Sequence, residues 1–73
     1  MTIEVIKNIL GFAEGGAIKS VVVGGTRLTF VTKTNEGTCD YNVNTKDKTL
    51  QVRDKSGTYF LDIKEISAIQ MEL

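Results

Sequence analysis

Cys39 is the only thiol in the sequence and so its first candidate for a nucleophile. A catalytic thiol needs a base and an electropositive setting, but the chain contains no histidine. Cys39 also alternates with Tyr41 and Val43, which predicts a small buried side chain. Asp62 and Glu65 could act as a general acid and base, yet they flank a predicted turn, where solvated charges are usual. These residues predict that the protein is not an enzyme.

The segment Asp54-Lys55-Ser56-Gly57-Thr58 resembles the phosphorylation loop of P-type ATPases, from which it differs at one residue. In that family the aspartate of the loop attacks phosphate, so the resemblance implies this role for Asp54. A hairpin turn explains the same residues, because aspartate favours the start of a turn and glycine supplies a positive φ. We therefore interpret the segment as a turn.

The remaining glycines do not form a cofactor site. Gly11, Gly15 and Gly16 precede Lys19-Ser20, but a phosphate-binding loop needs its lysine directly after the last glycine and a helix after it. Gly24-Gly25 stands between two β-rich runs, which is the signature of a hairpin. With one cysteine and no histidine, a tetrahedral zinc site is not expected either. The sequence predicts no cofactor and no metal.

The charge is balanced, with nine basic and nine acidic residues. Such a chain has no strong field to attract nucleic acid or an anionic membrane. Arg27, Lys33 and Arg53 could still gather on one side of a sheet, with Phe60 as a platform for a base. They are the candidate residues for the alternative of nucleic-acid binding.

The length of 73 residues predicts one small β-rich domain over residues 1–73. No secretory pattern and no long apolar segment is found, and the single thiol suits a reducing compartment. We therefore expect a cytoplasmic protein that does not contact a membrane. Small domains often gain stability from a partner subunit, and a net charge near zero mildly favours self-association.

Apolar residues at helical spacing predict one helix over residues 2–13, with Thr2 as its N-cap. Ile3 and Val5 also alternate, which leaves a strand over residues 2–6 as the alternative. After Gly16 the pattern becomes alternating and is interrupted by turn residues. The predicted strands cover residues 18–23, 26–34, 38–44, 48–53 and 58–63. The tail fits a helix or a strand, and we expect a tight turn over residues 64–66 and a last strand over 67–73.

The predicted fold is mainly β (α+β), with the helix packed on an antiparallel meander of five or six strands, because the connections are too short for crossovers. A helix, a meander, a short turn and a final strand form an order of elements that resembles small SH3-like and Sm-like barrels. The resemblance concerns element order, so no residues are carried over from those families.

Strand parity assigns most apolar side chains to one inner face. Three apolar residues fall on the other face: Val22, Val31 and Phe60. If they lie together, the helix or a second copy of the protein should cover them. We therefore expect a non-enzymatic protein-interaction module, a regulator, inhibitor or accessory subunit that forms homo-oligomers and binds another protein. The alternatives are an Sm-like ring that binds RNA or DNA and an oligomer that binds a small ligand.

Overall fold

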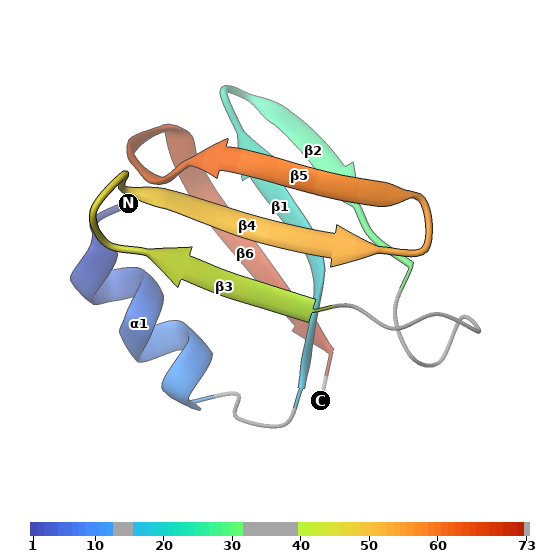
Figure 1. Ribbon diagram of the computed structural model, residues 1–73, viewed down its shortest axis with the longest axis horizontal. Helices are drawn as coiled ribbons and strands as arrows, with labels where there is room; N and C mark the ends of the chain where they lie inside the picture. Colours follow the sequence, from blue (N-terminus) through green and yellow to red (C-terminus); the bar gives the residue numbers. More distant parts are fainter. Residues whose placement is uncertain (13–15, 32–39, 73) are drawn as a thin grey trace.

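The computed structural model describes residues 1–12, 16–31 and 40–72 of the chain. In these residues one helix is followed by six strands, with a short 3₁₀ turn before the last of them, so the mainly β fold with an N-terminal helix is confirmed (Figure 1). The elements are α1 (Ile3–Phe12), β1 (Ala17–Val23), β2 (Thr26–Thr29), β3 (Asp40–Asn44), β4 (Thr49–Asp54), β5 (Gly57–Asp62), η2 (Ile63–Glu65) and β6 (Ile66–Glu72).

The strands form two antiparallel sheets, not the single predicted meander. The first sheet has the order β2-β1-β6 and the second has the order β3-β4-β5. In Figure 1 the second sheet lies in front and the first lies behind it at an angle. The meander prediction is wrong because β6 returns to pair with β1, from Ala17 opposite Glu72 to Val23 opposite Ile66. This long-range pairing ties the two ends of the β-rich part together.

Helix α1 begins where the sequence predicts an N-cap. The backbone N–H of Val5 donates to the Thr2 hydroxyl at 3.2 Å, and the N–H of Ile6 donates to the Thr2 carbonyl at 3.1 Å. These bonds satisfy groups that a helix leaves free at its start. Ile6 is fully buried in the core shared with both sheets. The helix therefore packs on the sheets through the apolar stripe and excludes the alternative strand.

Two of the hairpin turns form at glycine residues. Gly24 and Gly25 join β1 to β2 with φ values of 57° and 81°, which side chains with a Cβ rarely adopt. Asp54 lies opposite Gly57 at the β4–β5 turn, where Gly57 has a φ of 149°. Both turns were predicted from the sequence and are confirmed. The hairpin interpretation of residues 54–58 is therefore the correct one.

The second predicted strand is too long. It was expected over residues 26–34, but β2 ends at Thr29. The N–H of Val31 donates to the Asp54 carboxylate at 2.8 Å. This bond attaches the chain to the β4–β5 turn and ends the run of strand pairing. Residues 32–39 lie outside the described part of the chain, and with them Lys33 and Cys39.

The core lies between the two sheets. Within the described residues it contains ten buried apolar side chains: Ile6, Ala17, Ile18, Val21, Phe30, Leu50, Val52, Leu61, Ile63 and Ile66. The rings of Phe30 and Tyr59 meet edge to face at 5.1 Å and connect the end of β2 to β5. Apart from Cys39, every residue that parity assigned to the inner face is in this core or packs against it. The alternation of side chains along strands explains this success.

Candidate interaction surface

On the outer face of the second sheet, an exposed aromatic ring and hydrogen-bonding side chains occur together. Because successive side chains of a strand point to opposite faces, the register places three cross-strand rows on this face. The rows are Asp40–Arg53–Thr58, Asn42–Gln51–Phe60 and Asn44–Thr49–Asp62. We call these residues the outer face of the second sheet.

Phe60 is the apolar member of this face. It is 70% exposed, although its neighbour Leu61 is buried in the core. Gln51 lies directly opposite Phe60 on β4, so a ring and an amide are side by side. A large exposed aromatic residue among groups that donate and accept hydrogen bonds is typical of contact surfaces.

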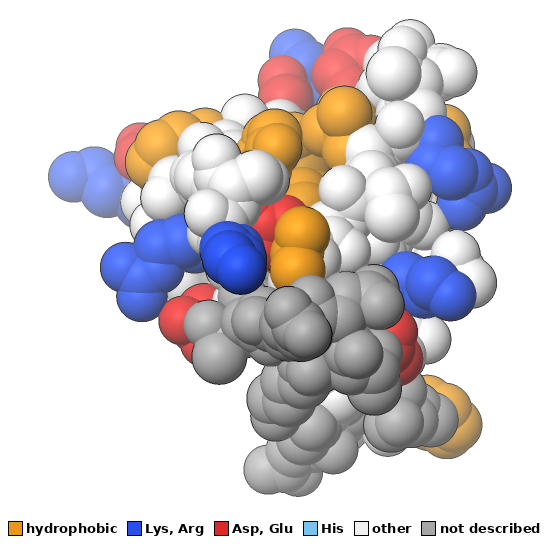
Figure 2. Space-filling model, turned by 90° about the vertical axis from the view of Figure 1, so that its right-hand side faces the viewer, with side chains coloured by type: hydrophobic (Ala, Val, Ile, Leu, Met, Phe, Trp, Pro, Cys, Tyr) orange, Lys and Arg blue, Asp and Glu red, His pale blue; other side chains and the backbone are white. Residues whose placement is uncertain are grey.

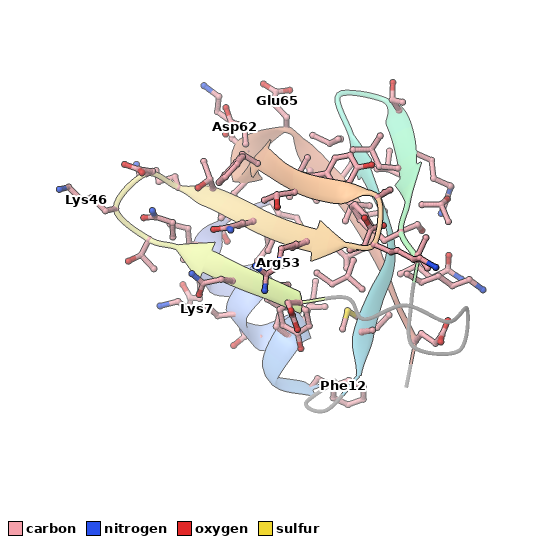
Figure 3. The ribbon with its side chains drawn as sticks, turned by 45° about the vertical axis from the view of Figure 1, so that its right-hand side comes forward. Lys7, Phe12, Lys46, Arg53, Asp62 and Glu65 are labelled. Carbon is pink, nitrogen blue, oxygen red and sulfur yellow. The ribbon has the colours of Figure 1, made fainter. Side chains whose placement is uncertain are left out.

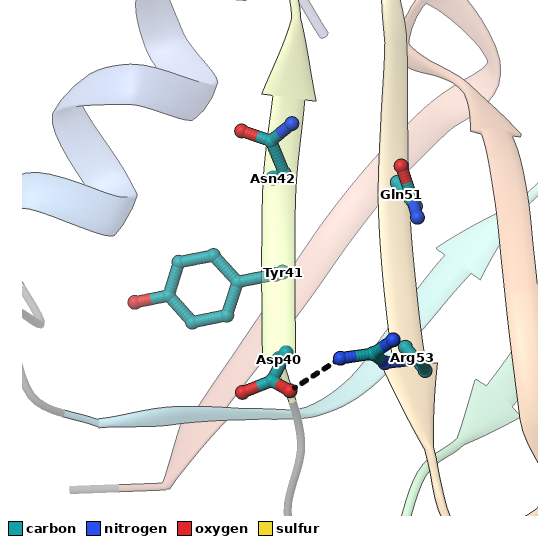
Figure 4. A pocket seen from close by; sticks show the side chains of 5 residues that line it. All are labelled: Asp40, Tyr41, Asn42, Gln51 and Arg53. Atoms are coloured by element: carbon teal, nitrogen blue, oxygen red, sulfur yellow. Dashed lines mark hydrogen bonds and ion pairs between the residues drawn. The ribbon is translucent and has the colours of Figure 1, made fainter.

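A shallow hollow of about 210 Å³ lies beside the Phe60 row. Figure 4 shows its lining from β3 and β4: Asp40, Tyr41, Asn42, Gln51 and Arg53. An Arg53 guanidinium nitrogen lies 3.3 Å from an Asp40 carboxylate oxygen, and both side chains are about two-thirds exposed. Pockets for small molecules usually enclose about 300–1,000 Å³. The hollow therefore suits the end of a partner's side chain better than a whole small molecule.

Val22 and Arg27 lie on the other sheet. They are opposite each other on the outer face of the first sheet, with Ala68 on the other side of Val22. The Arg27 guanidinium donates to the Ser20 hydroxyl at 2.9 Å, and that hydroxyl donates to the Gln70 amide oxygen at 3.1 Å. Ser20 is only 2% exposed, so Arg27 and Gln70 cover it. Val22 and Arg27 therefore lie on a different sheet from Phe60 and Arg53.

Val31 lies at the junction of the two sheets and not on either outer face. Its N–H bond to Asp54 places it at the β4–β5 turn, where it is half-buried. The three apolar residues predicted to form an interface therefore lie in three places. Helix α1 does not cover them as a group, because its buried residue joins the core between the sheets. Of the three, Phe60 is the exposed one.

Asp54 is a structural carboxylate that the sequence interpretation took only as a turn residue. It is 8% exposed and accepts hydrogen bonds from the Ser56 hydroxyl at 2.7 Å and the Ser56 N–H at 2.9 Å. Burial alone would raise the pKa of this carboxyl group. The hydrogen bonds from Ser56, from the Val31 N–H and from the Gly57 N–H outweigh that effect and lower the pKa. Asp54 thus remains a bound carboxylate that holds the β4–β5 turn against the end of β2.

Strand β5 presents a free edge next to Phe60. Among the described residues it pairs with β4 alone. The N–H of Ile63 donates to the carbonyl of Lys48 at 3.1 Å, which extends the β4–β5 register by one pair. Ile63 and Lys48 thus form a hydrogen-bonded pair, and hydrogen-bonded and non-hydrogen-bonded pairs alternate along an antiparallel ladder. The pairs that Thr58, Phe60 and Asp62 form with β4 are therefore non-hydrogen-bonded, and the backbone N–H and C=O groups of these three residues point away from β4. The exposed ring and the free backbone groups therefore belong to the same strand.

The cations in the described ranges do not form one basic patch. Arg53 is paired with Asp40, Arg27 is held on the first sheet, and Lys33 lies outside the described residues. Viewed from the right-hand side of Figure 1, small apolar areas alternate with basic and acidic side chains (Figure 2). Within residues 1–12, 16–31 and 40–72, no group of three or more His, Cys, Asp or Glu side chains could hold a metal ion. The geometry of the described residues therefore favours a contact surface over a phosphate-binding groove.

No family model matches this chain, and no curated protein and no solved structure was found to be similar to it. In the described part of the chain, no helix combines the length and the apolar character needed to cross a membrane.

Proposed function

We propose that the chain is a non-enzymatic protein-interaction module, a regulator or accessory subunit, that uses the outer face of the second sheet as its contact surface and self-associates through it. The observation that carries the proposal is Phe60, which is 70% exposed in the middle of the edge strand β5, on a face otherwise made of polar side chains. Contact surfaces are enriched in aromatic residues and arginine. Arg53 lies in the neighbouring row of the same face.

We further propose that the fold is a small barrel of the SH3-like or Sm-like plan. The support for this is the order of elements, in which a 3₁₀ turn follows β5 and the last strand returns to β1. Two small sheets at an angle, joined by Asp54 and by the Phe30–Tyr59 contact, suit such a barrel. An experimental structure in which backbone pairing through residues 32–39 joins the two sheets would support the assignment, and one in which these residues pair with neither sheet would contradict it.

Phe60→Lys tests the contact surface. A charged side chain at the centre of an interface should be strongly unfavourable, so the variant should have the monomer mass of 8.0 kDa in sedimentation when the wild-type protein is larger. The same variant should lose any partner that co-purifies with the wild-type protein from its native host.

Phe12→Lys is the matched control. Phe12 is 89% exposed at the end of α1, and Figure 3 shows it far from the outer face of the second sheet. The two variants make the same change in charge and remove the same ring. Equal masses for Phe60→Lys and the wild-type protein, with no partner lost, would refute the proposed contact surface.

A further inference from the structure

We infer that the occupant of the β5 edge is a second copy of this chain, paired antiparallel through β5 with Phe60 on the two-fold axis. The inference rests on the proposed function and specifies its geometry. It follows from the free backbone groups, the residues along the edge and the charges at the ends of β5.

The backbone of β5 is suited to strand addition. The backbone N–H and C=O groups of Thr58, Phe60 and Asp62 point away from β4, because the Ile63–Lys48 hydrogen bond fixes which pairs are hydrogen-bonded. Pairing with Phe60 opposite its own copy places Thr58 opposite Asp62 of the partner copy, and Asp62 opposite the partner's Thr58. All of these are hydrogen-bonded pairs, each of which exchanges two N–H···O bonds. If the two-fold axis is moved by one or two residues along β5, some of these backbone N–H and C=O groups have no partner. The register centred on Phe60 therefore pairs the largest number of them.

The side chains of β5 do not block such pairing. Natural edge strands are commonly protected by charged residues or proline, but residues 57–61 of β5 contain neither. The edge strand β2 carries Arg27 and is only four residues long. Figures 1 and 4 show α1 beside β3, and the nitrogen of Met1 donates to the Ile66 carbonyl at the start of β6. Of the edges described, β5 is the one with an exposed aromatic ring and no charge before its last residue.

The two-fold axis brings a cation of one copy toward carboxylates of the other copy. Lys55 lies in the turn before β5, whereas Asp62 and Glu65 lie at the other end, beside Lys64 and Lys48. Figure 3 shows Asp62 and Glu65 together at that end. Antiparallel self-pairing places Lys55 of one copy beside Asp62 and Glu65 of the other. It also brings the two Phe60 rings together on one face of a continuous sheet, where aromatic cross-strand pairs are favourable.

Thr58→Asp tests this register. In the dimer, the new carboxylate of each copy lies opposite Asp62 of the other copy, so two pairs of like charges form. Like charges directly opposite each other destabilise a sheet. Sedimentation equilibrium should show that the dimer dissociation constant rises roughly tenfold. Folding should be kept, because Thr58 is exposed and lies opposite Arg53 within its own sheet. Adding Asp62→Asn to Thr58→Asp should restore dimerisation to within about threefold of the wild-type value.

Thr26→Asp is the control, since it makes the same substitution at an exposed position of β2 in the first sheet, outside the outer face of the second sheet. It should leave the dissociation constant within about threefold of the wild-type value. In a Cys39→Ser background, Phe60→Cys should form a disulfide between copies, because paired Cα atoms about 5.5 Å apart permit one.

The outcomes separate the inference from the proposed function. If Phe60→Lys abolishes self-association and Thr58→Asp does not weaken it, strand pairing is refuted and the contact surface stands. A wild-type protein that is monomeric at every concentration refutes the dimer, whereas the loss of a co-purifying partner in Phe60→Lys would still support the contact surface. If neither variant changes any association, both proposals are wrong.

Discussion

Asp54 connects the two sheets through a small set of hydrogen bonds. Its carboxylate binds the Val31 N–H at the end of β2 and the Ser56 hydroxyl and N–H in its own turn. A buried carboxylate of this kind remains favourable because its donors replace the water that it has lost. The local part of this arrangement could be expected from the Asp54-x-Ser56-Gly57 turn. The bond to Val31 could not, because it joins residues 23 positions apart.

Asp54→Asn should destabilise the fold. The amide loses the charge and places two N–H donors near other donors, so the free energy of unfolding should fall by about 1–3 kcal/mol. Because the pKa of Asp54 is lowered in the fold, its contribution is present above the ordinary aspartate value of about 4 and is lost as the pH falls through the lower folded value. Urea unfolding at a series of pH values should therefore show the two proteins converging below about pH 4.

The control for this prediction is Asp40→Asn. Asp40 pairs with Arg53 on the exposed outer face, where an ion pair contributes about 0–1 kcal/mol. The assigned role of Asp54 would be contradicted if Asp54→Asn lowers the free energy of unfolding no more than Asp40→Asn does. A decrease that does not depend on pH would contradict it as well.

At the scale of elements, the β1–β2 hairpin requires a positive φ at both glycines of its turn. Gly24 and Gly25 have positive φ, and a Cβ added at either position would meet no atom within 4 Å. Replacing Gly24 by alanine should therefore cost about 1–2 kcal/mol through φ strain and not through a clash. Gly24→Asn should cost less, because asparagine tolerates this region. Thermal or urea unfolding measures both variants.

Gly11→Ala is the matched control for the hairpin. Gly11 lies in α1, has no positive φ and also has open space at its Cβ. The same chemical change should stabilise the protein by up to about 1 kcal/mol there. Equal and unfavourable effects at both positions would show that contacts absent from the structure control these glycines.

The sequence predicted the elements that depend on neighbouring residues. The N-cap at Thr2, the two glycine hairpins and the inner face of each strand follow from local turn chemistry and alternation. The division into two sheets and the return of β6 to β1 depend on long-range pairing, which no local pattern encodes. Phe60 was identified because its parity conflicts with its apolar character. Its separation from Val22 follows from the sheet division and could not be predicted.

At the scale of the whole molecule, the chain has a compact core but few ways to add stability. Its core consists mainly of apolar side chains from two three-stranded sheets and one helix. A domain of this length buries only about 60% of its unfolded surface, and it has a single cysteine and no histidine for a disulfide or a zinc site. Self-pairing through β5 would extend the second sheet and cover an exposed ring. The proposed interface would then contribute to stability as well as to recognition.

This coupling predicts that thermal stability depends on protein concentration. For a dimer that unfolds to monomers, each tenfold rise in concentration adds up to about 1.4 kcal/mol to the free energy of unfolding. Calorimetry of the wild-type protein over a wide range of concentrations should therefore show a rising Tm. The Tm of Thr58→Asp should begin to rise only at roughly tenfold higher concentration than that of the wild-type protein, while Thr26→Asp should follow the wild-type protein. A wild-type Tm that does not change with concentration while sedimentation shows a dimer would mean that the dimer dissociates before it unfolds, and that β5 pairing adds no stability.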